Sequence, residues 1–197
     1  MEARTAQITR VTRETDINLT LALDGKGKCN CQTGVGFLDH MLELFTAHGR
    51  FDLILRCTGD TQVDAHHSAE DIGIALGQAF ASALGERKGI TRYGQFLLPM
   101  DESLVLIAAD LCGRGCLEYA LELPAAKVGD FDTELVEEFL LGFVRNAGVT
   151  LHVRQLSGRN THHIIEAAFK GLGRALGQAV LVDARLEGEI PSTKGVL

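Results

Sequence analysis

The first strands of the chain are marked by apolar residues at every second position. Leucine and isoleucine occupy alternate positions from Ile17 to Leu23, which is the period of a β-strand with one buried face. Asp24 and Gly25, followed by Gly27, form a sequence typical of a β-hairpin turn. The N-terminal segment therefore predicts strands and a hairpin turn.

A helical period replaces this alternation further along the chain. Ile72, Leu76, Phe80 and Leu84 recur every four residues, so a helix over residues 66–86 would carry one apolar stripe. Similar patterns predict helices near 37–48, 132–147 and 161–183, and strands near 51–57, 93–99, 102–110, 115–121 and 149–156.

A His-His-x-x-Glu motif begins two of these helices. Its residues are His66, His67 and Glu70 in the first copy and His162, His163 and Glu166 in the second. The similarity extends upstream, where residues 45–55 match 143–153 with an offset of 98 (143 − 45), and residues 15–21 resemble 102–108. The same order of predicted elements therefore occurs twice in the sequence, which indicates an internal repeat.

Each copy reads as three strands, a helix, a strand and a second helix. The prediction is an α+β fold of two βββαβα repeats related by pseudo-two-fold symmetry, with the helices packed between two four-stranded sheets. The first repeat would span residues 1–90. The second would span residues 91–197 and would include a C-terminal tail that binds phosphate.

The composition narrows the class of protein. Hydrophobic residues make up 46% of the 197 residues and charged residues 23%, as in ordinary soluble domains. No apolar run approaches the roughly 18–20 residues of a membrane helix, and residues 1–6 lack the apolar segment of an export signal. The formal net charge of −7 disfavours nucleic acid and anionic membranes as partners. We expect a cytoplasmic protein.

Five cysteines, an odd number, are expected to remain reduced thiols. Cys29 and Cys31 lie two positions apart, and Cys112 and Cys116 lie four apart. Neither spacing is the CxxC of common zinc sites. Buried or edge-strand thiols are therefore the expected interpretation, and half of a zinc site is the less favoured alternative.

The repeated motif predicts two metal sites. His67 and Glu70 are three residues apart and share a helix face, as do His163 and Glu166. The leading histidine of each pair points about 100° away and would serve the other ion. Applying the offset of 98 to His40 gives Glu138. The two expected ligand sets are His40, His67, Glu70 and His162 for one ion, and His66, Glu138, His163 and Glu166 for the other. Imidazole and carboxylate ligands suit Mn, Fe, Co or Zn, and this choice stays open.

Basic residues beside small residues form a second candidate site. Arg92, Arg114 and Lys194 lie at expected turns, and Ser192 and Thr193 precede Lys194. Each cation alone is by default explained as a solvated surface residue. Together they could clamp a phosphate, because Arg makes bidentate contacts and the hydroxyls add donors.

Six ordered motifs give the chain a family resemblance over nearly its whole length. They are 36–41 (GFLDHM), 66–71 (HHSAED), 87–92 (RKGITR), 110–114 (DLCGR), 158–166 (GRNTHHIIE) and 191–195 (PSTKG). With these motifs the sequence resembles the imidazoleglycerol-phosphate dehydratases, the lyases of histidine biosynthesis that convert D-erythro-imidazoleglycerol phosphate to imidazole acetol phosphate.

The resemblance implies further properties. These are a site with two Mn²⁺ ions, a homo-oligomer of about 24 subunits with active sites between subunits, and a phosphate held by Arg92, Arg114, Ser192 and Lys194. Glu14 matches a substrate-contacting glutamate of the family and is a candidate acid or base. Glu166 is a second carboxylate that could carry the proton.

Three positions depart from the family pattern. Glu138 stands where the family usually has histidine, Leu44 where it has glutamine, and Ala65 where it commonly has aspartate. These changes motivate an alternative: a diverged dinuclear-metal enzyme that acts on another phosphorylated substrate. A third hypothesis is a non-catalytic oligomer assembled by metal. Arg92 and Arg114 disfavour it, because assembly alone does not require residues suited to binding phosphate.

Overall fold

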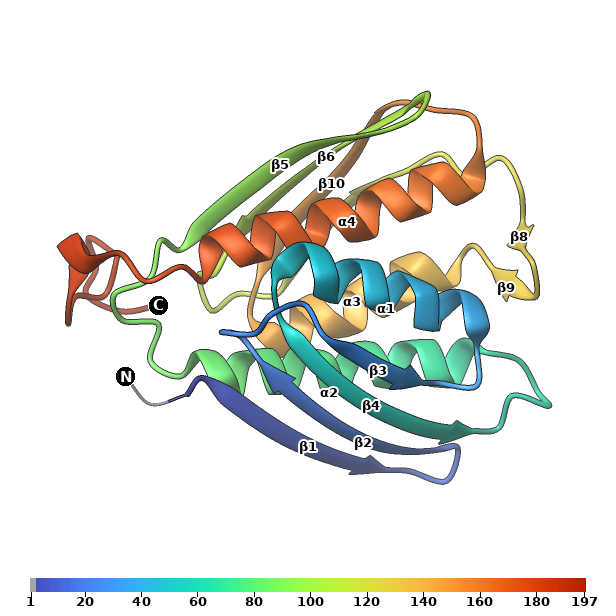
Figure 1. Cartoon of the computed structure of the whole chain (residues 1–197), viewed down its shortest axis with the longest axis horizontal. Helices are drawn as coiled ribbons and strands as arrows, with labels where there is room; N and C mark the ends of the chain where they lie inside the picture. Colours follow the sequence, from blue (N-terminus) through green and yellow to red (C-terminus); the bar gives the residue numbers. More distant parts are fainter. Residues whose placement is uncertain (1–2) are drawn as a thin grey trace.

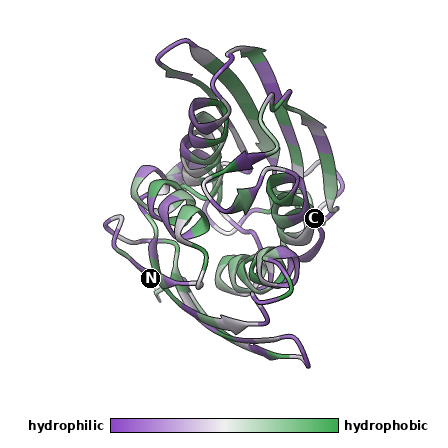
Figure 2. Cartoon of the chain, turned by 90° about the vertical axis from the view of Figure 1, so that its right-hand side faces the viewer, coloured by the Kyte–Doolittle hydropathy of each residue, from purple (hydrophilic) through white to green (hydrophobic). Residues whose placement is uncertain are grey.

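The computed structural model describes residues 3–197 and places four α-helices between two four-stranded sheets (Figure 1). The end-on view shows the same layering, with the helices enclosed by the two curved sheets (Figure 2). This architecture confirms the predicted α+β fold of two βββαβα repeats.

The two halves have the same element order and the same sheet order. The first half contains β1 (Thr5–Val11), β2 (Thr15–Ala22), β3 (Cys29–Gln32), α1 (Gly36–Gly49), β4 (Asp52–Gly59) and α2 (His66–Leu84). The second contains β5 (Tyr93–Met100), β6 (Ser103–Asp110), β7 (Cys116–Ala120), α3 (Leu135–Ala147), β10 (Thr150–Ser157) and α4 (Thr161–Ala179). The sheets are ordered β1-β2-β4-β3 and β5-β6-β10-β7, so each strand has a counterpart in the other half.

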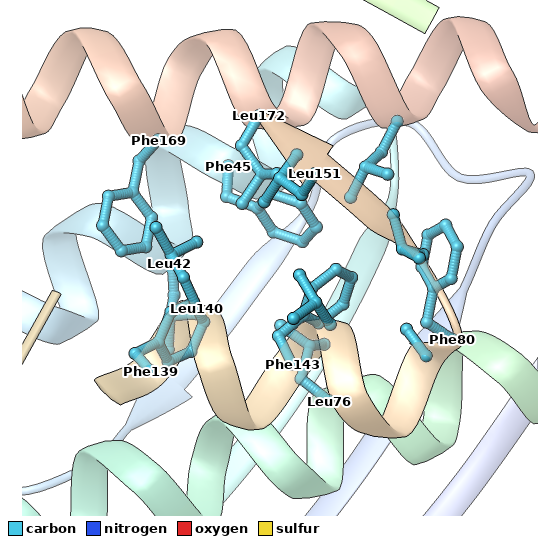
Figure 3. Close-up of a cluster of buried hydrophobic side chains, with 14 of the residues drawn as sticks. Leu42, Phe45, Leu76, Phe80, Phe139, Leu140, Phe143, Leu151, Phe169 and Leu172 are labelled. Carbon is cyan, nitrogen blue, oxygen red and sulfur yellow. The ribbon is translucent and has the colours of Figure 1, made fainter. Parts of the chain in front are cut away.

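The helices pair across the halves. Helix α1 packs on α4 and α2 packs on α3, so side chains from both repeats meet in one buried cluster (Figure 3). Phe45 of the first half and Phe143 of the second are both fully buried there. Neither half therefore encloses its own apolar stripe without the other.

Glycines allow these helices to approach closely. A Cβ added at Gly77 of α2 would lie less than 3.0 Å from the carbonyl oxygen of Phe143 in α3. A Cβ at Gly173 of α4 would meet the carbonyl oxygen of Phe45 in α1 at a similarly forbidden distance. Gly77 and Gly173 are related by the repeat with an offset of 96 (173 − 77), the same offset that separates His66 from His162. Phe45 and Phe143 are related with the offset of 98, so both helix pairs use the same backbone contact.

The predicted hairpin at Asp24 and Gly25 is wrong. Strand β2 pairs with β4, and β3 lies on the far side of β4 and runs parallel to it. The turn is instead tied to the start of β4, because a carboxylate oxygen of Asp52 accepts hydrogen bonds from the backbone N–H groups of Lys26 and Lys28, both at 2.8 Å. Local turn residues do not specify which strand follows in the sheet.

The match of residues 15–21 with 102–108 is also wrong, by one residue. The buried face of β2 begins at Thr15 and that of β6 begins at Ser103, so the offset between these strands is 88 (103 − 15). A shift of one residue inverts the two faces of a strand. The corrected register makes Glu102 the counterpart of Glu14.

Two helix boundaries differ from the prediction. Helix α3 begins at Leu135, not near 132, because a small hairpin of β8 (Lys127–Val128) and β9 (Phe131–Asp132) precedes it. Helix α4 ends at Ala179, not near 183, because Val182 forms a β-bridge with Ile90. A 3₁₀ turn, Ala184–Leu186, follows. Within residues 3–197, no helix is long and apolar enough to cross a membrane.

We expect Gly77→Ala and Gly173→Ala each to lower the free energy of unfolding by about 1–3 kcal/mol, because the added methyl group separates two helix backbones. Gly36→Ala is the matched control, since a Cβ there meets no atom within 4 Å and alanine favours a helix. Urea denaturation measures all three. Equal stability of the Gly77→Ala and Gly36→Ala variants would contradict the close-contact interpretation.

Candidate active site

Three predicted metal ligands meet where α1 packs on α4. The Nε2 atom of His40 lies 3.7 Å from Oε2 of Glu166, and Nε2 of His162 lies 3.1 Å from the same oxygen. One ligand atom from each of the three residues lies within 4.8 Å of the other two. Among residues 3–197 this is the one set of three such ligands gathered so closely.

The start of α4 is fixed by an N-cap. The side chain of Asn160 accepts hydrogen bonds from the backbone N–H groups of His162 and His163, at 3.0 and 3.4 Å. This cap satisfies amides that the first turn of a helix leaves without partners. It therefore sets the position from which both histidines project.

Glu166 is a buried carboxylate held in its charged form. Burial alone would raise the pKa of Glu166, but the Lys170 ammonium, 2.5 Å from Oε1, and the His162 ring outweigh burial and keep the pKa below its usual value. Metal ligation requires the deprotonated carboxylate. Lys170 thus helps to keep Glu166 ready to bind a cation.

Aromatic side chains support the His162 ring. Phe37 meets it edge-on with ring centroids 5.2 Å apart, and Phe37 also lies 5.2 Å from Phe131 of the β8–β9 hairpin. The hairpin, His40 and His162 together line a hollow of about 680 Å³. The space beside the three ligands is therefore large enough for a small molecule.

The donor set fits a divalent metal ion. It offers two imidazole nitrogens and one carboxylate oxygen, and no thiolate. Metal–ligand bonds of about 2.0–2.2 Å allow donors about 4 Å apart to share one ion, a spacing near that of the three residues. Such ligands suit Mn, Fe, Co or Zn.

The second histidine of each motif faces carboxylates instead. Nδ1 of His67 lies 3.0 Å from a carboxylate oxygen of Asp60, and its Nε2 lies 3.7 Å from Glu14. Nδ1 of His163 lies 2.8 Å from Glu102. Hydrogen bonding to Asp60 raises the pKa of His67, and hydrogen bonding to Glu102 raises that of His163 and lowers the pKa of Glu102. A carboxylate that is hydrogen-bonded to one ring nitrogen fixes the orientation of the ring and leaves the other nitrogen available to a metal ion.

The ligand grouping within one chain differs from the two predicted sets. His162 pairs with Glu166 four residues later, and His40 joins them; His67 lies beside Asp60. The reason is helix pairing, since α1 packs on α4 and not on α2. The repeat then relates this trio to Glu138, His66 and Glu70 on α3 and α2.

This second trio is more open than the first. Glu138 and His66 are half-buried and Glu70 is exposed. In the described part of the chain, their ligand atoms are not drawn into a group as close as the first. The structure therefore gathers the first trio of candidate ligands closely and leaves the second trio more exposed.

The predicted phosphate residues gather at the other end of α4. Arg92 donates hydrogen bonds to both carboxylate oxygens of Asp110, at 2.7 and 3.0 Å, and to the carbonyl of Pro191 at 2.8 Å. Asp110 raises the pKa of Arg92. The contact with Pro191 brings the tail residues Ser192, Thr193 and Lys194 close to Arg92.

Arg114 lies in a loop at the same end of the molecule. It is exposed, and its neighbour Gly113 lies against the backbone of Leu197, the last residue of the tail. The structure thus places Arg92 and Arg114 near the C-terminal tail, which carries Ser192, Thr193 and Lys194.

The two clusters are far apart within one chain. The backbone N–H of Arg92 donates to the carbonyl of Ala179 at the end of α4, and His162 lies at its start. The helix rises about 1.5 Å per residue, so these 17 steps (179 − 162) span about 25 Å. A small phosphorylated molecule cannot touch both clusters of the same chain.

The sequence reasoning missed four residues beside the candidate ligands. They are Asp60, Glu102, Phe131 and Lys170. Two of them had a usable signal. Lys170 lies one helical turn after Glu166, and the corrected register identifies Glu102 as the counterpart of Glu14. Asp60 reaches the site from a loop and Phe131 from the two-residue strand β9, and neither segment is long enough to carry a periodic signal.

The Asp60–His67 contact predicts a shift that NMR can measure in metal-free protein. We expect Asp60→Asn to lower the pKa of His67 toward the ordinary value of about 6.5, because the protonated ring loses its carboxylate partner. Asp64→Asn is the control, since Asp64 is the weakest contributor to this pKa. Equal effects of both variants would contradict the direct contact. Because an imidazole ring binds metal only when neutral, any metal binding by His67 should weaken as the pH drops through its raised pKa.

Comparison with known proteins places these features in a family. The family model described as imidazoleglycerol-phosphate dehydratase matches residues 33–176. The dehydratase of Desulforamulus reducens is 63% identical over 194 residues, with 98% of each chain covered. That of Synechococcus sp. WH7803 is 55% identical over 194 residues, covering 98% of this chain and 96% of the relative.

Solved structures agree with the sequence relatives. The crystal structure of imidazoleglycerol-phosphate dehydratase from Staphylococcus aureus matches with a TM-score of 0.83 and 42% identity, covering 91% of this chain and 99% of its own. That from Pyrococcus furiosus matches with a TM-score of 0.84 and 39% identity, covering 96% and 100%. Sequence, fold and family model agree over most of the chain: it belongs to the imidazoleglycerol-phosphate dehydratases, the hydro-lyases of histidine biosynthesis.

Proposed function

We propose that this chain eliminates water from D-erythro-imidazoleglycerol phosphate to give imidazole acetol phosphate, with two Mn²⁺ ions in each active site. The observation that carries the metal part of the proposal is the meeting of His40, His162 and Glu166 beside a hollow of about 680 Å³. Manganese is chosen because of the family resemblance and because the donor set is compatible with it.

The residues divide into two half-sites for metal. His40, His162 and Glu166 form one, and Glu138, His66 and Glu70 form the other. When bound, the metal supplies Lewis-acid polarisation and a template for the imidazole ring. His67 and His163 contact Asp60 and Glu102 instead of the two trios. We therefore assign them to the half-sites of neighbouring copies.

Carboxylates of this chain provide candidates for proton transfer. Glu14 is exposed and lies 3.7 Å from the ring of His67, so its carboxylate faces solvent beside a candidate metal ligand. Glu166 is held deprotonated by Lys170 and can accept a proton only if it leaves that contact. Glu14 is therefore the better placed acid or base.

The phosphate would bind at Arg92, Arg114, Ser192, Thr193 and Lys194. Holding the phosphate end orients the reacting carbons and uses binding energy from a remote group. Because this cluster lies about 25 Å from the metal ligands of the same chain, we propose that each active site combines residues of different copies. A homo-oligomer, with 24 subunits as in the family resemblance, supplies these copies.

The three departures from the family pattern leave a site that can still work. Glu138 is half-buried on α3 and can ligate through oxygen, which Mn²⁺ accepts. Leu44 packs against the hydrophobic core. Ala65 offers no side-chain cap to α2, but the neighbouring Asp64 accepts a hydrogen bond from the backbone N–H of His66 at 2.8 Å. Asp64 thus does part of what an aspartate at 65 would do.

The direct test is turnover of imidazoleglycerol phosphate by the Mn-loaded protein. We expect native activity, and more than a 100-fold loss in His162→Ala with a lower manganese content, because changes even to the partners of metal ligands cost about 10–100-fold. His152→Ala is the matched control, since His152 is exposed on β10 away from the ligands. Full activity and metal content in His162→Ala would overturn the site.

Glu138 separates the dehydratase from the alternative of a diverged enzyme with another phosphorylated substrate. We expect the native chain and Glu138→His both to be active, with the variant faster, because a neutral imidazole leaves the ion more able to polarise substrate. A native chain without turnover, combined with an active Glu138→His variant, would instead favour the diverged enzyme.

A further inference from the structure

Two thiols lie side by side on an edge strand, outside the ligand set described above. Cys29 and Cys31 are two residues apart on β3, so their side chains point to the same face of the sheet. Their sulfur atoms are 3.0 Å apart. Strand β3 pairs only with β4 and forms the edge of its sheet.

The two thiols open into a hollow shared with helix α1. This hollow, of about 380 Å³, is lined by Cys29 and Cys31 and by Asp39, His40 and Glu43 of the first turns of α1. Both cysteines are half-buried. A small group bound to the sulfurs can therefore enter from solvent and is partly enclosed once bound.

The two thiols differ in acidity. The hydrogen bond from Cys31 lowers the pKa of the Cys29 thiol, and the same contact together with burial raises the pKa of Cys31. Cys29 is thus the better nucleophile of the pair, and Cys31 lies within reach to form a second bond.

A disulfide does not suit this geometry. Alternate residues of an extended strand have Cα atoms about 6.6 Å apart, near the upper limit of about 6.8 Å for disulfides. Closing the bond would also require the sulfurs, now 3.0 Å apart, to approach to about 2.05 Å at this limiting Cα separation. An atom inserted between the sulfurs bridges them without this movement.

Zinc does not suit it either. Thiolates bound to tetrahedral zinc at about 2.3 Å lie about 3.8 Å apart, and a structural site needs two further ligands. Among residues 3–197, neither cysteine belongs to a group of three metal-ligating side chains. A linear ion such as copper(I) would hold the sulfurs still farther apart. A pyramidal centre with a small angle between two sulfurs matches better.

We propose that Cys29 and Cys31 form a chelating site for a trivalent arsenical in the hollow beside α1. With an organoarsenic oxide, each sulfur forms one S–As bond. The two thiol protons leave with the oxygen as one water molecule, and arsenic stays trivalent.

Phenylarsine oxide is the probe, applied to the full native protein. After incubation, the protein is transferred into excess 2-mercaptoethanol. This monothiol removes arsenic that is bound to a single cysteine but not arsenic that is bound to two. The mass of the protein is then measured. We expect one phenylarsenic group to be retained at this site. Cys29→Ser and Cys31→Ser should each retain at least tenfold less of it.

Cys57→Ser is the matched control and should retain the group as the native chain does. Cys57 is half-buried on the neighbouring strand β4 and keeps the Cys29–Cys31 pair intact. Retention by either single variant at the native level would overturn the proposal. So would a mass lower by two hydrogen atoms and without arsenic, measured before the 2-mercaptoethanol step, because it would show that dissolved oxygen had oxidised the pair to a disulfide. Neither outcome depends on dehydratase activity.

Discussion

The close approach of helix backbones across the two halves is the contact on which the rest of the molecule depends. Gly77 lies against Phe143 and Gly173 against Phe45, and these contacts bring α2 onto α3 and α1 onto α4. With a side chain at either glycine the helices would move apart. The apolar stripes of both repeats would then lose the partners that bury them. Separation of α1 from α4 at Gly173 would also move His40 away from the start of α4.

The same contact positions two sets of candidate metal ligands, which correspond through the repeat but differ in charge. In the closely gathered set, Lys170 neutralises Glu166. The repeat places Ile74 at the position of Lys170, and Glu138 at the position of His40. The more exposed set therefore carries two carboxylates without the lysine. It should attract a divalent cation strongly but leave that cation less able to polarise a substrate.

Sequence reasoning predicted the fold well because the apolar periods and the repeated motif specify elements and their order. It failed where the outcome depends on pairing in space. The turn at Asp24 and Gly25 does not reveal that β4 inserts between β2 and β3, and the weak match of residues 15–21 allowed a slip of one residue. Helix spacing suggested candidate ligand types, but it did not show that His162 and Glu166 lie beside His40, because that depends on which helices pack together.

The central claim of the proposed function is that one active site takes metal ligands and phosphate ligands from different copies, since about 25 Å separates them in one chain. The most direct measurement is complementation. His162→Ala and Lys194→Ala chains, each inactive alone, are co-expressed with different tags and purified through both. Sites between copies would restore about one quarter of native turnover, because random mixing leaves that share of sites intact. A mixed oligomer as inactive as its components would show that each site lies within a single chain.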